Sequence, residues 1–201
     1  MMKCLVAILA GVLVAACGGN VRTSEIARYD FGDLPGKGSG SRVPIATVEV
    51  QAASWMEGPT MYFRLDYADS LRRQSYADSR WAAPPAELLE AFLMRRMVFG
   101  QADFSGAGCR LQLVLDEMEQ RFDDPQRSQV VLQVRALLAS SRGAEILSRR
   151  VLIVRQAAPT PSAAGAVAAT RDAVQALAGE LAGWLDEIGR DRPAIVERCR
   201  A

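Results

Sequence analysis

Residues 110–116 read Arg-Leu-Gln-Leu-Val-Leu-Asp, and this alternation of polar and apolar side chains sets the architecture of the chain. Successive side chains of a strand point to opposite faces of a sheet, so the three leucines share one face. Residues 129–138 and 146–155 alternate in the same way. Turn-forming residues at 123–125 and 140–143 separate the three runs. The pattern predicts an antiparallel meander with one apolar face and one mixed face.

Helical patterns lie on both sides of this meander. Pro84-Pro85 opens the first, because proline is tolerated in a first helical turn, and Gly100 ends it. After a linker at 157–164, the second runs to about Ile188. Apolar residues recur at helical spacing in both, at Leu88, Leu89, Phe92, Leu93 and Met97 and at Val167, Val174, Leu177, Leu181, Trp184 and Ile188. We interpret both stripes as core-packing faces.

Strand patterns also precede the first helix. Residues 43–50 are rich in β-branched side chains and predict a strand that reaches toward Trp55. Residues 61–67 alternate and predict a second strand, and the break at Gly58-Pro59 predicts that the two form a hairpin. Residues 76–83 are irregular or a short strand. The order β-β-α-β-β-β-α predicts an α+β fold, in which one mostly antiparallel sheet is backed by two helices on one face.

The first residues have the features of a bacterial lipoprotein signal. Lys3 precedes an apolar run that is too short to span a bilayer, and the small residues at 14–16 are followed directly by Cys17. The alternative is an ordinary secretion signal with a chance cysteine. We predict a signal peptide at 1–16 and lipid attachment at Cys17. An acylated, flexible tether follows at 17–42, with a short ordered strand near 29–32, and a single α+β domain at 43–201.

Two cysteines remain after Cys4 leaves with the signal and Cys17 is acylated. In an oxidising envelope, Cys109 and Cys199 are candidates for a disulfide that fastens the C-terminal tail to the start of a central strand. The alternative is two buried free thiols. No other segment reaches about 18 consecutive apolar residues, so the acyl chains would provide the anchor.

Composition argues against several functions. The chain has 24 Lys and Arg against 23 Asp and Glu, and removal of Lys3 balances them, which disfavours nucleic acid as a partner. It has no histidine, and it has no motif of a nucleophile elbow, a phosphate loop or a metal cluster. We expect no enzyme activity, no cofactor and no metal. Glu117 and Glu119 alternate on one strand face, and we expect both to be exposed.

The segment Tyr76-Ala77-Asp78-Ser79-Arg80-Trp81 is unusual, because two aromatic and two charged residues stand just ahead of a helix. One interpretation is structural, with Trp81 in the core and a local ion pair between Asp78 and Arg80. The other assigns Tyr76, Asp78, Arg80 and Trp81 to partner binding. A second candidate is Tyr29-Asp30-Phe31, which could bind a partner by strand addition.

These segments, in this order, resemble the ABC-type transport auxiliary lipoprotein family. The resemblance rests on Tyr76-x-Asp78-x-Arg80-Trp81-x-x-Pro84-Pro85, which follows a strand containing Tyr62-x-Arg64-Leu65. Tyr29-Asp30-Phe31-Gly32 is similar to an opening Tyr-Asp-Leu-Gly strand, with Phe31 in place of leucine. The charged run at 115–123 and the helix with Trp184 also match, so that the resemblance extends from Tyr29 to Ile188.

The resemblance implies a non-catalytic auxiliary component of an envelope lipid-transport system, similar to the lipoprotein of the paraquat-inducible MCE systems. It implies an outer-membrane anchor on the periplasmic side, consistent with Gly18 after the acylated cysteine, and an MCE-domain protein as partner. Alternatives are an outer-membrane assembly lipoprotein, or a lipid carrier with a cavity lined by residues such as Phe92, Met94, Met97 and Leu138. Whether the domain forms a homo-oligomer stays open.

Overall fold

The computed structural model describes residues 25–33, 39–98, 108–140 and 145–200. The predicted signal peptide, Cys17, Gly100 and most of the predicted turn at 140–143 lie outside these ranges. Within the described residues no helix is both long enough and apolar enough to cross a membrane.

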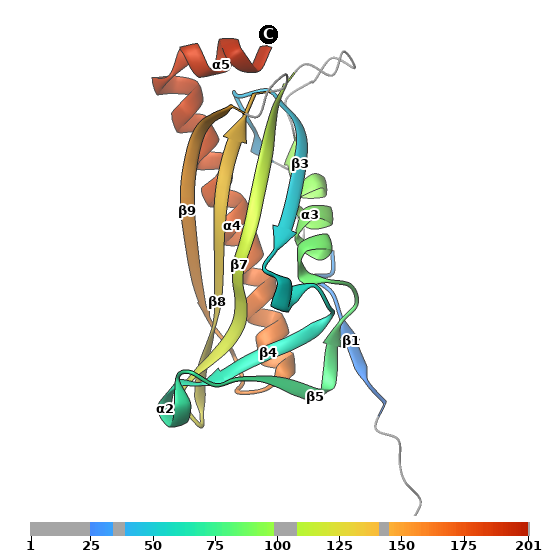
Figure 1. The fold of residues 1–201 in the computed structure, drawn as a ribbon. Helices are drawn as coiled ribbons and strands as arrows, with labels where there is room; N and C mark the ends of the chain where they lie inside the picture. Colours follow the sequence, from blue (N-terminus) through green and yellow to red (C-terminus); the bar gives the residue numbers. More distant parts are fainter. Residues whose placement is uncertain (1–24, 34–38, 99–107, 141–144, 201) are drawn as a thin grey trace, which may run out of the picture.

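A seven-stranded sheet forms the body of the domain, with the order β1-β5-β4-β7-β8-β9 and with β3 also paired to β7 (Figure 1). Its strands are β1 Ala27–Tyr29, β3 Ile45–Ala52, β4 Thr60–Leu65, β5 Arg73–Trp81, β7 Cys109–Asp124, β8 Arg127–Ala139 and β9 Ile146–Ala157. The short strands β2 Ser39–Gly40 and β6 Met97–Val98 pair separately. The predicted meander is present, because β7, β8 and β9 pair antiparallel in sequence order.

The long strand β7 organises the rest of the sheet. One edge of β7 pairs with β8 along almost its whole length. Its other edge pairs in parallel first with β3, at Cys109 to Leu115, and then with β4, at Gln120 to Phe122. A bulge between Leu115 and Glu117 separates these two halves and increases the local twist.

The predicted hairpin between the first two long strands is wrong. Both β3 and β4 run parallel to β7 along the same edge, so the chain passes from one to the other without reversing direction. The connection contains a 3-10 turn, η2 Ser54–Met56, and the amide of Ala53 donates to the carbonyl of Leu115 at 3.1 Å. The antiparallel partner of β4 is β5, a full strand of nine residues where an irregular segment or a short strand was expected.

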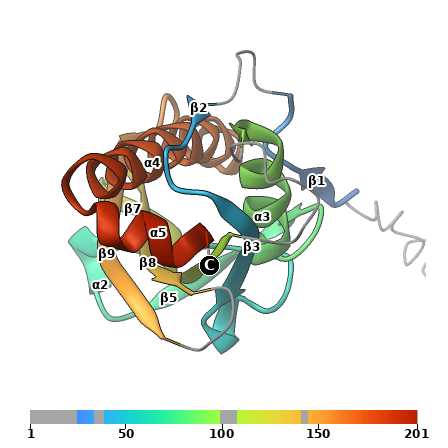
Figure 2. The same cartoon turned by 90° about the horizontal axis from the view of Figure 1, so that it is seen from above.

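The two long helices, α3 Pro85–Arg96 and α4 Ala163–Asp191, lie on the same face of the sheet (Figure 2). Ser162 begins α4 as its N-cap, accepting a hydrogen bond from the amide of Gly165 at 3.2 Å. The apolar stripe of α4 is buried against the sheet, at Val174, Leu177, Leu181, Trp184 and Ile188. The α+β fold class, with its mostly antiparallel sheet and helices on one face, is therefore confirmed.

The chain ends in a short helix that the sequence did not predict, α5 Pro193–Arg200. Cys199 of α5 forms a disulfide with Cys109, the first residue of β7, and both residues are fully buried. Val196 of α5 is also buried. The disulfide thus fastens the C-terminal helix to the start of the central strand, as the cysteine count suggested. A four-residue helix, α2 Asp66–Asp69, connects β4 to β5.

Candidate functional site

Both candidate partner-binding segments meet at one edge of the sheet. The strand β1 pairs in parallel with the end of β5, and Tyr29 lies opposite Trp81 in the register. The amide of Ala82 donates to the carbonyl of Tyr29 at 2.7 Å, which extends the pairing by one bond. The segment around Tyr29 therefore adds a strand to this chain's own sheet.

Phe31 and Trp81 belong to the core rather than to the surface. Phe31 is buried and meets Trp81 edge to face, with ring centroids 5.7 Å apart, and it meets Phe92 of α3 in the same way at 6.2 Å. Asp30 accepts a hydrogen bond from the amide of Gly32 at 2.8 Å, and Gly32 has φ of 61°, a conformation that favours glycine. This turn ends β1 and directs Phe31 into the core.

The other residues of β5 have mixed environments. The Tyr76 hydroxyl donates to Gln120 Oε1, and its burial raises its pKa to about 12. Arg80 donates to the carbonyls of Tyr76 and Ser79. The expected ion pair between Asp78 and Arg80 is wrong, since none of the ion pairs between described residues joins them. Asp78 is exposed, and a role in partner binding stays a prediction for these residues.

Replacing Phe31 by leucine is expected to lower the free energy of unfolding by about 1 kcal/mol, because it removes two edge-to-face ring contacts but keeps most of the apolar volume. Urea denaturation of the full chain would measure this change. Tyr67→Leu is the matched control, since Tyr67 is 48% exposed and its loss should alter stability by less than about 0.5 kcal/mol. Equal effects of the two substitutions would show that the Phe31 contacts contribute nothing.

A buried ionic cluster lies on the face of the sheet away from the helices. Glu119 accepts hydrogen bonds at 2.9 Å from Nε of Arg64 and from Nε of Arg73, and its side chain is 0% exposed. Glu117 lies 3.3 Å from Arg73, and the guanidinium of Arg73 stacks 3.5 Å over the ring of Trp55. The expectation that Glu117 and Glu119 would both be exposed is wrong, because the two arginines and their neighbours cover Glu119 and leave the side chain of Glu117 only 23% exposed.

The neighbouring charges of this cluster shift the pKa values of Glu117 and Arg64. Burial, together with the negative charge of Glu119, raises the pKa of Glu117 above its ordinary value. The hydrogen bond that Glu119 accepts raises the pKa of Arg64, which keeps this guanidinium charged. The cluster is satisfied internally, so it holds β4, β5 and β7 together rather than offering a site to a ligand.

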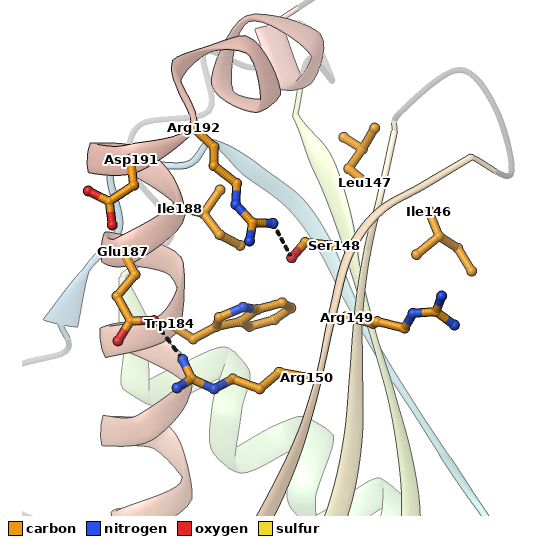
Figure 3. A pocket seen from close by; sticks show the side chains of 10 residues that line it. All are labelled: Ile146, Leu147, Ser148, Arg149, Arg150, Trp184, Glu187, Ile188, Asp191 and Arg192. Carbon is orange, nitrogen blue, oxygen red and sulfur yellow. Dashed lines mark hydrogen bonds and ion pairs between the residues drawn. The ribbon is translucent and has the colours of Figure 1, made fainter.

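A groove of about 620 Å³ opens between the start of β9 and the end of α4 (Figure 3). Trp184 and Ile188 of α4 line it together with residues 146–150 of β9. At its rim Arg150 pairs with Glu187 at 2.8 Å, and Arg192 donates to Ser148 Oγ at 3.4 Å. Arg149 points to the other side of β9, away from α4 (Figure 3).

Sequence reasoning did not find this groove. Its signal lies on the other face of β9, where Ser148 and Arg150 precede the apolar Leu152 and Val154 and interrupt the apolar pattern at the start of the strand. Among the residues proposed to line a lipid cavity, Phe92 and Leu138 are packed in the core, and Met94 is 54% exposed. No group of three or more metal-ligating side chains occurs among the residues that the structure describes.

The fold and these surfaces define a two-layer α+β domain, in which a helix pair covers one sheet face and the other face is open. A model of the family described as ABC-type transport auxiliary lipoprotein component matches residues 37–182. The chain belongs to this family. No curated protein matches it.

Solved structures share the fold. The crystal structure of a Xanthomonas campestris protein of the family DUF330 is similar with a TM-score of 0.66 and 18% identity, over 85% of this chain and 97% of that chain. A second crystal structure, of an uncharacterized protein, has a TM-score of 0.62 and 12% identity, over 80% of this chain and 99% of that one. At these identities the likeness concerns the fold alone.

Proposed function

We propose that this chain is the outer-membrane-anchored auxiliary lipoprotein of an MCE-type ABC lipid transport system, and that it acts by binding rather than by catalysis. The observation that carries the proposal is the family match over residues 37–182, which makes the chain an auxiliary component of ABC-type transport. The resemblance of the Tyr76–Trp81 segment to the lipoprotein of MCE systems supports the finer assignment.

The anchor is assigned to Cys17. The small residues before it suit cleavage by the lipoprotein signal peptidase, and Gly18 lacks the aspartate that typically retains a lipoprotein in the inner membrane. Because Ala27–Tyr29 pair in the sheet, the tether on the periplasmic face would be the residues between Cys17 and Ala27, and a flexible chain of that length has a root-mean-square reach on the order of 15 Å. This reach would let the domain meet a partner that extends from the inner membrane.

The buried features of the domain support a binding role. The charged cluster around Glu119 is occupied by its own ion pairs, and Phe31 and Trp81 are used for packing. The surfaces left for a partner are exposed side chains, such as Asp78 and those of β9, which suit protein recognition.

In-cell crosslinking and affinity purification of the full-length, acylated protein, followed by mass spectrometry, would test this function. We expect recovery of an MCE-domain protein, and we expect Cys17→Ser to release the chain from the outer-membrane fraction and to reduce that recovery. Recovery of β-barrel or lipopolysaccharide assembly machinery without an MCE protein would contradict the proposal. A stoichiometric phospholipid on the purified protein would instead favour a lipid carrier.

A further inference from the structure

The strand β9 forms an open edge of the sheet (Figure 1). It is 12 residues long and pairs with β8 on one side, while no described strand pairs with its other side. A free edge presents a row of backbone N–H and C=O groups that another strand can bind. The opposite edge of the sheet differs, because the three-residue β1 occupies it.

The side chains of β9 protect this edge by charge alone, at Arg149, Arg150 and Arg155. Of the seven large apolar residues that are exposed in the described chain, three belong to β9, namely Ile146 at 51%, Val151 at 57% and Ile153 at 43%. Edge strands are commonly protected by being short, bulged or covered, or by charged side chains. Exposed β-branched residues on a long edge instead favour strand pairing.

The exposed face of β9 is also positively charged. The register between β8 and β9 is continuous from Arg149 to Ala157, so Arg149, Val151, Ile153 and Arg155 share one face. Both arginines are exposed, and neither has an ion-pair partner among the described residues. Arg135, opposite Val151, is already paired with Asp116 at 2.7 Å. The open face of β9 therefore carries two uncompensated positive charges that flank two apolar residues.

The other face of β9 is closed to an acidic ligand. Arg150 is directed to α4 and pairs with Glu187, and Asp191 also lines the groove beside it (Figure 3). Further along, Leu152 and Val154 are buried against the helices. A segment that pairs with β9 would thus place neutral side chains toward α4.

We propose that β9 is a docking strand for an extended, acidic segment of a partner protein, which adds to the sheet edge-on. Its side chains on the open face follow the order carboxylate, apolar, apolar, carboxylate at every second residue. In this register the carboxylates meet Arg149 and Arg155, and the apolar residues meet Val151 and Ile153. The order of carboxylates and apolar residues is symmetric, so a partner strand with this order can pair with β9 in either a parallel or an antiparallel direction.

A second copy of this chain fits the edge poorly in the register that brings Val151 and Ile153 together. The antiparallel register that places Val151 opposite Ile153 also places Arg149 opposite Arg155, and it does so twice because of the twofold symmetry. Like charges directly opposite each other destabilise a strand pair. In this register the charge of β9 favours a partner of opposite sign. This surface goes beyond the proposed function, since an MCE protein could also be bound elsewhere on the domain.

The test uses the full-length protein and a synthetic peptide, Thr-Asp-Thr-Val-Thr-Ile-Thr-Asp-Thr, with a control peptide in which lysine replaces both aspartates. Hydrogen exchange and fluorescence anisotropy are measured together. We expect the aspartate peptide to slow exchange in β9 but not in β5, and to bind at least about tenfold more tightly than the lysine peptide.

Charge reversal at both arginines, R149E/R155E, should invert this preference, and binding of the lysine peptide would show that the variant is folded. R72E is the matched control, because Arg72 is exposed in the turn before β5 and its reversal should leave both affinities unchanged. Three results would overturn the proposal. The first is equal binding of the two peptides to the unaltered protein, and the second is binding of the aspartate peptide that survives R149E/R155E. The third is slower exchange in β9 without peptide as the protein concentration rises, which would indicate that a second copy binds there.

Discussion

The substitution Cys199→Ser is expected to lower the free energy of unfolding by about 4.5 kcal/mol, the largest effect of any single change considered for this domain. The bond closes a loop with a sequence separation of 90 residues, and in the chain-entropy account a loop of this length strongly restricts the unfolded state. Loss of the bond also frees α5, whose buried residues are Val196 and Cys199 itself. The free energy would be measured by guanidinium denaturation of the full chain.

A double-mutant cycle separates the contribution of the disulfide to the free energy of unfolding from the contributions of the two side chains. Cys109→Ser should cost about as much as Cys199→Ser, and the double substitution should cost little more than either alone, because the bond is lost only once. The unaltered protein in a reducing agent should unfold at the same denaturant concentration as the variants. A reductant that leaves the midpoint of the unaltered protein unchanged would show that the disulfide does not stabilise the domain.

The substitution Glu119→Gln is expected to lower the free energy of unfolding by about 3 kcal/mol, because it removes the charge that neutralises two partly buried arginines. Arg64 and Arg73 have side chains that are 13% and 27% exposed, so water can solvate them only in part. Glutamine keeps the volume and one oxygen acceptor, so the loss reports on charge and not on a cavity. Thermal or urea denaturation near neutral pH would measure it.

Glu117→Gln is the matched control, since it makes the same chemical change two residues away and beside the same arginines. The pKa of Glu117 is raised in the folded state, so the folded protein holds this proton to a higher pH than the unfolded chain does. Stability therefore falls as pH rises from the ordinary glutamate range through the raised pKa. Glu117→Gln should be no less stable than the unaltered protein at neutral pH, and any gain should vanish in acid. A loss as large as that of Glu119→Gln would contradict this assignment.

Local patterns predicted the parts of the fold that local chemistry determines. Alternation along 110–116, 129–138 and 146–155, with turn residues between the runs, was sufficient for the meander. Helical spacing was sufficient for α4, whose stripe from Val174 to Ile188 is buried. Both patterns are repeated over many residues, so a single exception does not change the interpretation.

The pairing of β3 and β4 could not be predicted in the same way. Alternation identifies a strand but not its partner, and Gly58-Pro59 is as compatible with a change of direction as with a short irregular connection. The partner here is β7, which is long enough to accept both strands on one edge. The length of β7 determines that β3 and β4 both pair with it, and this consequence becomes visible only when the whole sheet is known.

The sequence singles out some residues of the candidate sites, but not the contacts that these residues make with distant parts of the chain. Trp81 and Phe31 were recognised as unusual, but their contact with each other depends on parallel pairing between β1 and β5. Glu119 was misjudged because its burial depends on Arg64 and Arg73, which lie far away in the sequence. Residues that act through a distant partner carry no local sign of it.

The central position of β7 also constrains the order in which this chain can fold. During synthesis the N-terminal strands emerge first, yet Ile45 of β3 pairs with Cys109, so β3 has no sheet partner until β7 has followed. Contacts of such high sequence separation make folding slow, and unpaired apolar strands are prone to aggregate meanwhile. The domain therefore completes its sheet late, after most of the chain is available. A chaperone that covers β3 until β7 is available would prevent aggregation of this unpaired strand.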